Sequence, residues 1–240
     1  MSVVIWEKDE NVAIVKMNTE TNSHNLEFAN ALGKALDEVI ADETVTAIVL
    51  TSTNEKNFSL GVDIQWVMEK LGEADNEAIK EFMYGMNENF KKLLLLPVPT
   101  IAAINGHAFG NGAILSCACD FRFMREDRGY FCFPEVDLGI PFLPGMVALC
   151  KLSMPYYKYK ELKLTGKKAG AKELEADNVI LKACENTDKL MEEAVAYAKT
   201  FTKKRGIFGE HKRRLNQHVS EIMKSDDPEY IDAINLFVQD

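Results

Sequence analysis

The residues with the clearest potential for chemistry lie between positions 99 and 145. An apolar run at residues 100–104 has the length of a buried strand. A turn rich in glycine follows at residues 106–112, and an apolar helix begins at Ala113. A strand, a glycine turn and a helix in this order direct backbone N–H groups toward one anionic or polarised oxygen. An isolated turn of this kind more often serves only tight turning and close packing.

A single carboxylate, Glu135, follows Pro134 in the same stretch and lies between Phe133 and Val136. A carboxylate with apolar neighbours can have a raised pKa and can act as a base. A glutamate chosen at random is more often an exposed or salt-bridged surface residue. The apolar neighbours of Glu135 favour the role of a base, and the downstream carboxylate in turn favours an oxygen-binding role for the glycine turn.

Hydrophobic patterns predict the elements that would hold this stretch in place. Two β-rich runs at residues 3–6 and 12–17 flank a polar turn and predict a hairpin. Apolar residues at helical spacing over 28–39 predict a helix that faces the core, and residues 47–51 predict another strand. A strand, a helix and a strand with short connections imply parallel pairing and a right-handed crossover.

Helical patterns dominate the second half of the chain. Short strands are predicted within residues 121–133, and the predicted helices cover residues 76–96, 146–152, 155–166, 171–177, 187–201, 208–223 and 228–238. The helices after residue 187 have weak apolar stripes, so the core or a neighbouring subunit must cover them. We therefore divide the chain into a core at residues 1–186 and a helical C-terminal region at residues 187–240.

Composition disfavours several classes of function. The formal net charge of −9 over 240 residues argues against a nucleic-acid partner, because binding needs a basic face. Five cysteines without a C-x-x-C pair are expected to be reduced thiols, and four histidines without metal-ligand spacing predict no metal site. No secretory signal or membrane-spanning run is recognisable, so we expect a cytoplasmic protein without a membrane partner.

Four motifs in order resemble those of the crotonase superfamily, the enoyl-CoA hydratases and isomerases. Residues 58–64 read F-S-L-G-V-D-I and are similar to that family's F-(S/A)-x-G-x-D-(I/L) segment. Residues 105–112 read N-G-H-A-F-G-N-G and resemble its N-G-x-A-x-G-x-G turn. Residues 134–139 and 164–167 resemble its P-E-x-x-L-G and L-T-G-(R/K) segments. The match covers most of the chain and is weakest after about residue 187.

The resemblance implies an α/β fold with a crotonase-like β-β-α spiral core and a C-terminal helical region that forms a homotrimer or a dimer of trimers. It implies a substrate carried as a thioester of coenzyme A, with no other cofactor. By position, the Val62 and Asn111 amides would form an oxyanion hole, and Glu135 would be catalytic. The implied substrate-binding residues are Ser59, Leu60, Gly61, Asp63, Ile64, Gly110, Ile114 and Leu143, and the implied CoA-binding residues are Ser23, His24, Asn25 and Leu26.

The number of carboxylates indicates which reaction fits. Family members that hydrate a double bond have a second glutamate just after the glycine turn, where this chain has Ile114. Hydration normally shares acid and base work between two groups, whereas one base can move a proton from the alpha to the gamma carbon. The sequence therefore predicts an isomerase of fatty acid metabolism that converts 3-enoyl-CoA to 2-enoyl-CoA, with Glu135 as acid and base. A dienoyl isomerase would have an aspartate where Leu143 stands.

Several alternatives remain open. Asp137 would share a face with Glu135 on an extended segment, although a loop residue bonded to backbone amides is its more usual role. Other candidates are weak hydration, thioester hydrolysis, or acyl-CoA binding without catalysis. Asn22 and Gln65 replace basic residues that the family often uses near the CoA head group. Basic residues within 203–214 are expected to form a solvated helix face, with a contact to CoA phosphates as the sharper hypothesis.

Overall fold

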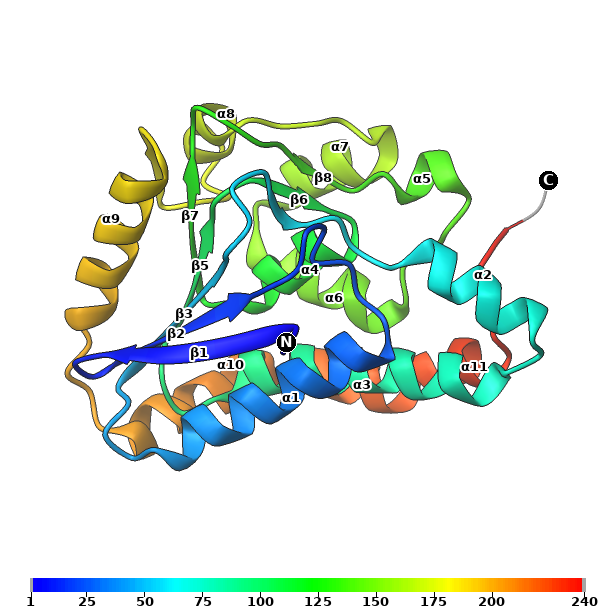
Figure 1. Ribbon diagram of the computed structural model, residues 1–240, viewed down its shortest axis with the longest axis horizontal. Helices are drawn as coiled ribbons and strands as arrows, with labels where there is room; N and C mark the ends of the chain where they lie inside the picture. The colour runs from blue at the N-terminus through cyan, green and yellow to red at the C-terminus, as the bar shows by residue number, and fades with distance from the viewer. Residues whose placement is uncertain (1, 239–240) are drawn as a thin grey trace.

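Two sheets with helices packed around them make up the computed structural model, which describes residues 2–238 (Figure 1). The larger sheet has the order β1-β2-β3-β5-β7-β9, and the smaller one has the order β4-β6-β8. β1 pairs antiparallel with β2, and the other pairs are parallel. The strands are β1 (Val4–Asp9), β2 (Val12–Met17), β3 (Ala47–Ser52), β4 (Asn57–Ser59), β5 (Thr100–Ile104), β6 (His107–Phe109), β7 (Phe121–Arg125), β8 (Phe131–Cys132) and β9 (Lys182–Cys184).

The N-terminal elements follow the sequence prediction. β1 and β2 form the expected hairpin, with Glu10 in the left-handed region at its turn. α1 (Leu26–Ala41) then crosses to β3, which lies parallel to β2 with Val15 beside Leu50. Both the hairpin and the parallel pairing are therefore confirmed.

β3 divides its side chains between two cores, because successive residues of a strand point to opposite faces of the sheet. Ile48 and Leu50 belong to the main core, together with buried residues of α1 and of α3 (Asn76–Leu95). Ala47 and Val49 belong to a second core beneath α9 (Thr187–Lys199). α9 lies along the left side of Figure 1 and supplies Leu190, Ala194 and Ala198 to that core. The sheet thus provides the surface that this weakly apolar helix needs.

The remaining helices surround the smaller sheet and the other side of the main core. α10 packs against α3 and α6, so the core also covers this C-terminal helix. The helices are α2 (Ile64–Gly72), α4 (Asn111–Ala118), α5 (Glu135–Leu138), α6 (Pro144–Ser153), α7 (Tyr156–Thr165), α8 (Ala171–Ala176), α10 (Arg205–Ser225) and α11 (Asp227–Asp232). No helix among residues 2–238 is long and apolar enough to cross a membrane.

The end of the chain differs from the sequence prediction. A helix was expected over residues 228–238, but α11 ends at Asp232, and Ile234 adopts a positive φ of 49° that a helix cannot continue through. The segment that follows lies beside the loop after α5, where the Val238 amide donates to the Gly139 carbonyl at 2.8 Å. A contact of this kind between distant segments leaves no periodic signal in the sequence.

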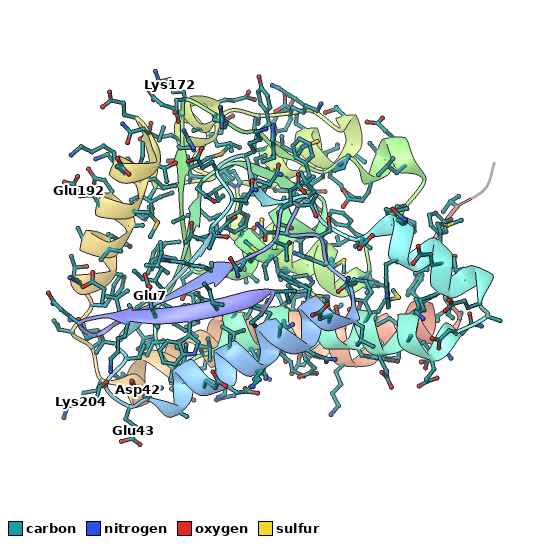
Figure 2. All side chains as sticks on the ribbon, in the orientation of Figure 1. Glu7, Asp42, Glu43, Lys172, Glu192 and Lys204 are labelled. Carbon is teal, nitrogen blue, oxygen red and sulfur yellow. The ribbon has the colours of Figure 1, made fainter. Side chains whose placement is uncertain are left out.

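The basic residues within 203–214 do not form one solvated face. Lys212 is buried and donates to the Asp120 carboxylate and to the Leu93 carbonyl. Arg205 donates to the Ile40 carbonyl, and Arg213 pairs with a glutamate of its own helix. The exposed charges are instead scattered over the surface, as Lys172, Glu192 and Lys204 illustrate in Figure 2.

Candidate active site

A cavity of about 150 Å³ brings together most of the predicted site residues. Its walls come from the loop after β4, from α2 and α3, from the start of α4, from residues 134–146 and from residues 235–237. Figure 1 shows α2, α5 and the C-terminal segment on the same side of the molecule. The predicted residues that line the cavity are Leu60, Val62, Ile64, Gly110, Asn111, Ile114, Glu135 and Leu143.

Glu135 is the only ionisable side chain among the described residues that line this cavity. It is the first residue of α5 and is 8% exposed. Burial raises the pKa of Glu135 to about 7, because the charged carboxylate loses water, and the positive charge of Lys163 only partly opposes this. Oε2 of Glu135 is buried and has no hydrogen-bond partner among residues 2–238. A carboxylate in this state is equipped to exchange protons near neutral pH.

The raised pKa of Glu135 predicts a measurable cost to stability. A carboxyl with a higher pKa in the folded state contributes stability below about pH 4.5, and this contribution is lost as the pH rises through about 7. Glu135→Gln cannot ionise, so its free energy of unfolding relative to wild type should increase over that range by about 3 kcal/mol. Urea unfolding of both proteins at acidic and alkaline pH measures this difference. A difference that stays constant with pH would contradict the burial of a charged Glu135.

Gly110 leaves the space that the Glu135 carboxylate occupies. It precedes α4 with φ 53° and ψ −124°, a conformation that side chains rarely adopt. A Cβ atom at this position would lie 2.8 Å from Oε1 of Glu135. The glycine therefore allows the carboxylate to approach the first turn of α4.

The two loops of the predicted oxyanion hole are in direct contact. Gly61 has φ +85°, and a Cβ atom there would lie 3.0 Å from the Asn111 amide nitrogen and 2.7 Å from the Phe109 carbonyl oxygen. Only a glycine allows such a close approach of the two backbones. The amide of Val62, the next residue, is thus held close to the N-terminal end of α4.

Neither predicted oxyanion donor has a hydrogen-bond acceptor among the described residues. The bridge between His24 and Val62 uses the Gly61 carbonyl and the Asp63 amide, which leaves the Val62 amide unpaired. Asn111 is the first residue of α4, so its amide lies beyond the reach of the helix's own carbonyls. Both residues line the cavity that contains Glu135.

Residues 7–235 match the sequence model of one protein family, which is described as enoyl-CoA hydratase/isomerase. The chain belongs to the enoyl-CoA hydratase/isomerase family. Its fold agrees, because the apo structure of an enoyl-CoA isomerase from Mycobacterium tuberculosis superposes with a TM-score of 0.85 at 21% identity, over 97% of this chain and 98% of that one. The α/β crotonase fold and the helical C-terminal region expected from the sequence are confirmed.

Relatives within the enoyl-CoA hydratase/isomerase family carry names for both reactions. The chain is 34% identical over 165 residues to enoyl-CoA delta isomerase 3 of Arabidopsis thaliana, covering 66% of this chain and 67% of the relative. It is 37% identical over 146 residues to the same plant's enoyl-CoA delta isomerase 2, peroxisomal, covering 58% of each. It is 34% identical over 152 residues to a short-chain-enoyl-CoA hydratase of Clostridium acetobutylicum, covering 62% of this chain and 56% of the relative. The alignments to the last two thus span less than two thirds of those relatives.

Three predicted substrate-binding residues lie behind the cavity wall rather than in it. Ser59 is fully buried, and its hydroxyl accepts from the Gly61 amide at 3.1 Å. Gly61 provides the close approach to α4 described above. The Asp63 carboxylate caps α2 by accepting from the Trp66 amide, as a residue before a helix often does. These residues shape the loop that carries Val62.

The four residues predicted to bind CoA differ in their surroundings. The Ser23 hydroxyl donates to Thr21, and Asn25 caps α1. Leu26 lies beside a separate surface hollow, near Tyr84. His24 is fully buried, with its amide donating to Gly61 and its carbonyl accepting from Asp63. Contacts of this segment to CoA stay a prediction, but the main-chain groups of His24 are already used within the protein.

The structure also answers the question about Asp137. Glu135 and Asp137 lie on a short helix, not on the extended segment that would give them a common face. Residues two apart on a helix do not face the same way. Asp137 is exposed and points toward Gly166, where a Cβ atom would lie 2.4 Å from its Oδ2. The alternative in which the two carboxylates share a face therefore does not hold.

Sequence reasoning missed much of the cavity wall, including the face of α3 that lines it. Leu236 and Phe237 line it from the C-terminal segment that was expected to be helical. Phe142 also lines it, and Nζ of Lys163 lies 3.3 Å from the centroid of its ring. Burial lowers the pKa of Lys163, with Glu135 acting in the opposite direction. Only the tertiary fold brings these groups together.

No group of three or more potential metal ligands occurs among the described residues.

Proposed function

We propose that this protein is an enoyl-CoA delta-isomerase, which converts a 3-enoyl-CoA into the conjugated 2-enoyl-CoA. The observation that carries the proposal is that, among the described residues, Glu135 is the one ionisable side chain in a mostly apolar cavity and the Val62 and Asn111 amides that line it have no acceptor. The apolar wall accommodates the acyl chain, and the thioester oxygen accepts hydrogen bonds from the Val62 and Asn111 amides.

In the proposed mechanism, one carboxylate carries a proton between two carbons. Ionised Glu135 takes a proton from C2, and the electron pair of that C–H bond moves into the thioester carbonyl to give an enolate. The enolate then forms the C2–C3 double bond, and the former C3–C4 double bond takes the proton from Glu135 at C4. The carboxylate is restored, and no other reactant is consumed.

Stabilisation of the enolate is the main task of the protein in this scheme. Loss of one donor from an oxyanion hole costs about 2.7–4 kcal/mol in other enzymes. The Asn111 amide has a further advantage, because it stands at the N-terminus of α4, where the helix dipole favours negative charge. The apolar surroundings strengthen both interactions by excluding water.

Hydration is the competing reaction, because a hydratase is among the relatives. Addition of water to a double bond needs one group to hold the water and another to protonate carbon. Ile114, which is buried, occupies the position where hydratases of the family have their second glutamate, and it faces the same cavity as Glu135. The proposal therefore favours proton transfer over hydration.

An assay of both reactions tests the proposal. With 3-hexenoyl-CoA, absorbance of the conjugated 2-enoyl thioester should appear, while crotonyl-CoA should be hydrated at least about tenfold more slowly. Faster hydration than isomerisation would assign the protein to the hydratases. Acyl-CoA binding with neither reaction would support a binding protein.

The pH dependence of isomerisation follows from the state of Glu135. The base must be ionised in the free enzyme, and its pKa is raised to about 7 by burial. We expect kcat/KM to rise about tenfold per pH unit in acid, to be half-maximal near pH 7, and to level off above. A profile that is already flat at about pH 5 would show that Glu135 is not the base in this environment.

The predicted homotrimer or dimer of trimers stays a prediction. Sedimentation velocity of the purified protein distinguishes one, three and six copies directly. A monomer that retains full isomerase activity would show that the site is complete within one chain.

A further inference from the structure

A chain of buried hydrogen bonds joins the two loops that hold the Val62 and Asn111 amides. We propose that His24 is a positioning residue whose imidazole fastens the Asn111 side chain to Ser59 and so fixes the spacing of the two oxyanion donors. The effect of this positioning on turnover rests on the proposed function. The positioning itself can be tested with a bound ligand.

The contacts join four buried residues. Nδ2 of Asn111 lies 3.0 Å from Nδ1 of His24, and Nε2 of His24 lies 2.9 Å from Oγ of Ser59. The Ser59 hydroxyl donates to the Asn22 carbonyl at 2.7 Å. His24, Ser59 and Asn22 are fully buried, and Asn111 is 4% exposed.

The protons in this chain have one consistent arrangement. The Ser59 hydroxyl has a single hydrogen, which it donates to Asn22, so the bond from His24 to Ser59 must use the hydrogen on Nε2. Nδ1 of His24 then carries a lone pair and accepts from Asn111. The ring is neutral, and burial lowers the pKa of His24 to about 3, so this arrangement persists at every pH at which Glu135 titrates.

His24 also holds the other loop through its main chain. Its amide donates to the Gly61 carbonyl at 2.7 Å, and its carbonyl accepts from the Asp63 amide at 2.9 Å. These bonds lie on either side of Val62. The ring itself is stacked on Phe28, with a centroid distance of 4.1 Å and an interplanar angle of 13°. One residue therefore contacts the carriers of both oxyanion donors.

The Asn111 side chain depends on this contact. Among the described residues its amide group makes one hydrogen bond, to His24, while its Oδ1 has no partner. The residue opens α4 directly after Gly110, whose side is open for Glu135. Without His24, nothing in the described structure would tie the first side chain of α4 to the loop that carries Val62.

His24→Leu removes both side-chain bonds and retains an apolar group of similar length. We expect kcat for isomerisation to fall about tenfold to a hundredfold, because a loosened donor loses part of an oxyanion-hole contribution. KM should change less than about threefold, and the pH of half-maximal kcat/KM should not move, because Glu135 is untouched. His24→Asn should recover part of the loss, since its Oδ1 can accept from Asn111 in place of Nδ1.

A double-mutant cycle separates positioning from general damage. Asn111→Ala removes the same bond and keeps the main-chain donor, so its effect on kcat should overlap with that of His24→Leu. The double variant should be no slower than about the slower single variant. If the two single-variant losses of kcat multiply in the double variant, the proposal is overturned. An unchanged kcat in His24→Leu would also overturn it. If His24→Leu does not fold, Asn111→Ala alone decides, because it removes the same bond from the other side, and an unchanged kcat in that variant would overturn the proposal.

A spectroscopic measurement tests, without turnover, whether His24 positions the two oxyanion donors. The thioester carbonyl of butyryl-CoA, labelled with ¹³C, should vibrate at lower frequency when bound to wild type than when free, because two amides polarise it. The lowering should be smaller in His24→Leu and partly recovered in His24→Asn. Equal lowering in all three proteins would overturn the role of His24 alone. Failure of wild type to bind butyryl-CoA would overturn the proposed function itself.

Discussion

Glu135→Gln should abolish isomerisation while leaving acyl-CoA binding nearly intact. The amide has almost the same shape as the carboxyl but cannot take a proton from C2. Glu135 is the only ionisable group among the described residues of the cavity, so no neighbouring residue there can replace it. General acid–base catalysis contributes about 10²–10⁴-fold, and the loss should lie at the upper end because one residue performs both transfers.

Asp137→Asn is the matched control for this experiment. Asp137 lies two residues further along α5 and is exposed. Its loss should change kcat less than about threefold. The measurement is kcat with 3-hexenoyl-CoA together with the dissociation constant of butyryl-CoA for each variant. Turnover in Glu135→Gln within about tenfold of wild type would remove Glu135 from the mechanism.

Gly61→Ala should lower kcat by about 10²–10³-fold, because it displaces the backbone that carries the oxyanion donors. The added Cβ would lie 2.7 Å from the Phe109 carbonyl oxygen and 3.0 Å from the Asn111 amide nitrogen, so the two loops must move apart. The positive φ of Gly61 adds strain to the same loop. An oxyanion hole loses about this factor when one donor is misplaced.

Gly72→Ala provides the control for the change of residue type. Gly72 ends α2, its φ is not positive, and a Cβ atom there would meet nothing within 4 Å. This variant should be as active and at least as stable as wild type, since alanine is the better helix residue. Gly61→Ala with wild-type kcat and an intact fold would show that the spacing of the two loops does not matter.

The parts of the fold that the sequence predicts are those with a local cause. Short β-rich runs identified β2 and β3, and apolar residues at helical spacing identified α1, because these patterns lie within the elements themselves. The glycine turn and the lone carboxylate pointed to the candidate site because close backbone approach and an apolar neighbourhood leave traces in a short stretch. The weak stripe on α9 correctly indicated a helix that needs cover.

The parts that could not be predicted depend on distant contacts. No pattern near His24 in the sequence predicts its hydrogen bond to Asn111, which lies 87 positions away. No sequence pattern predicted the short helix α5, which turns Asp137 away from Glu135. The contribution of Phe237 to the cavity depends on where the chain runs after α11. Such placements are set by packing across the whole fold.

The candidate site also illustrates how function competes with stability. A carboxylate whose pKa is raised to about 7 by burial, with one oxygen lacking any partner among residues 2–238, destabilises the folded state at neutral pH. The same burial makes it a stronger base than an exposed glutamate. The pH-dependent gain in stability expected for Glu135→Gln and its loss of activity are therefore two consequences of one cause.

The central claim is that one carboxylate removes the proton at C2 and delivers it at C4. The most direct test follows deuterium in ordinary water, using 3-hexenoyl-CoA that carries two deuterium atoms at C2. The product should retain one deuterium at C2 and carry deuterium at C4 in a substantial fraction of molecules, because Glu135 is buried and returns what it took. Product that has gained only solvent hydrogen at C4, even in the first turnovers, would contradict a single carrier.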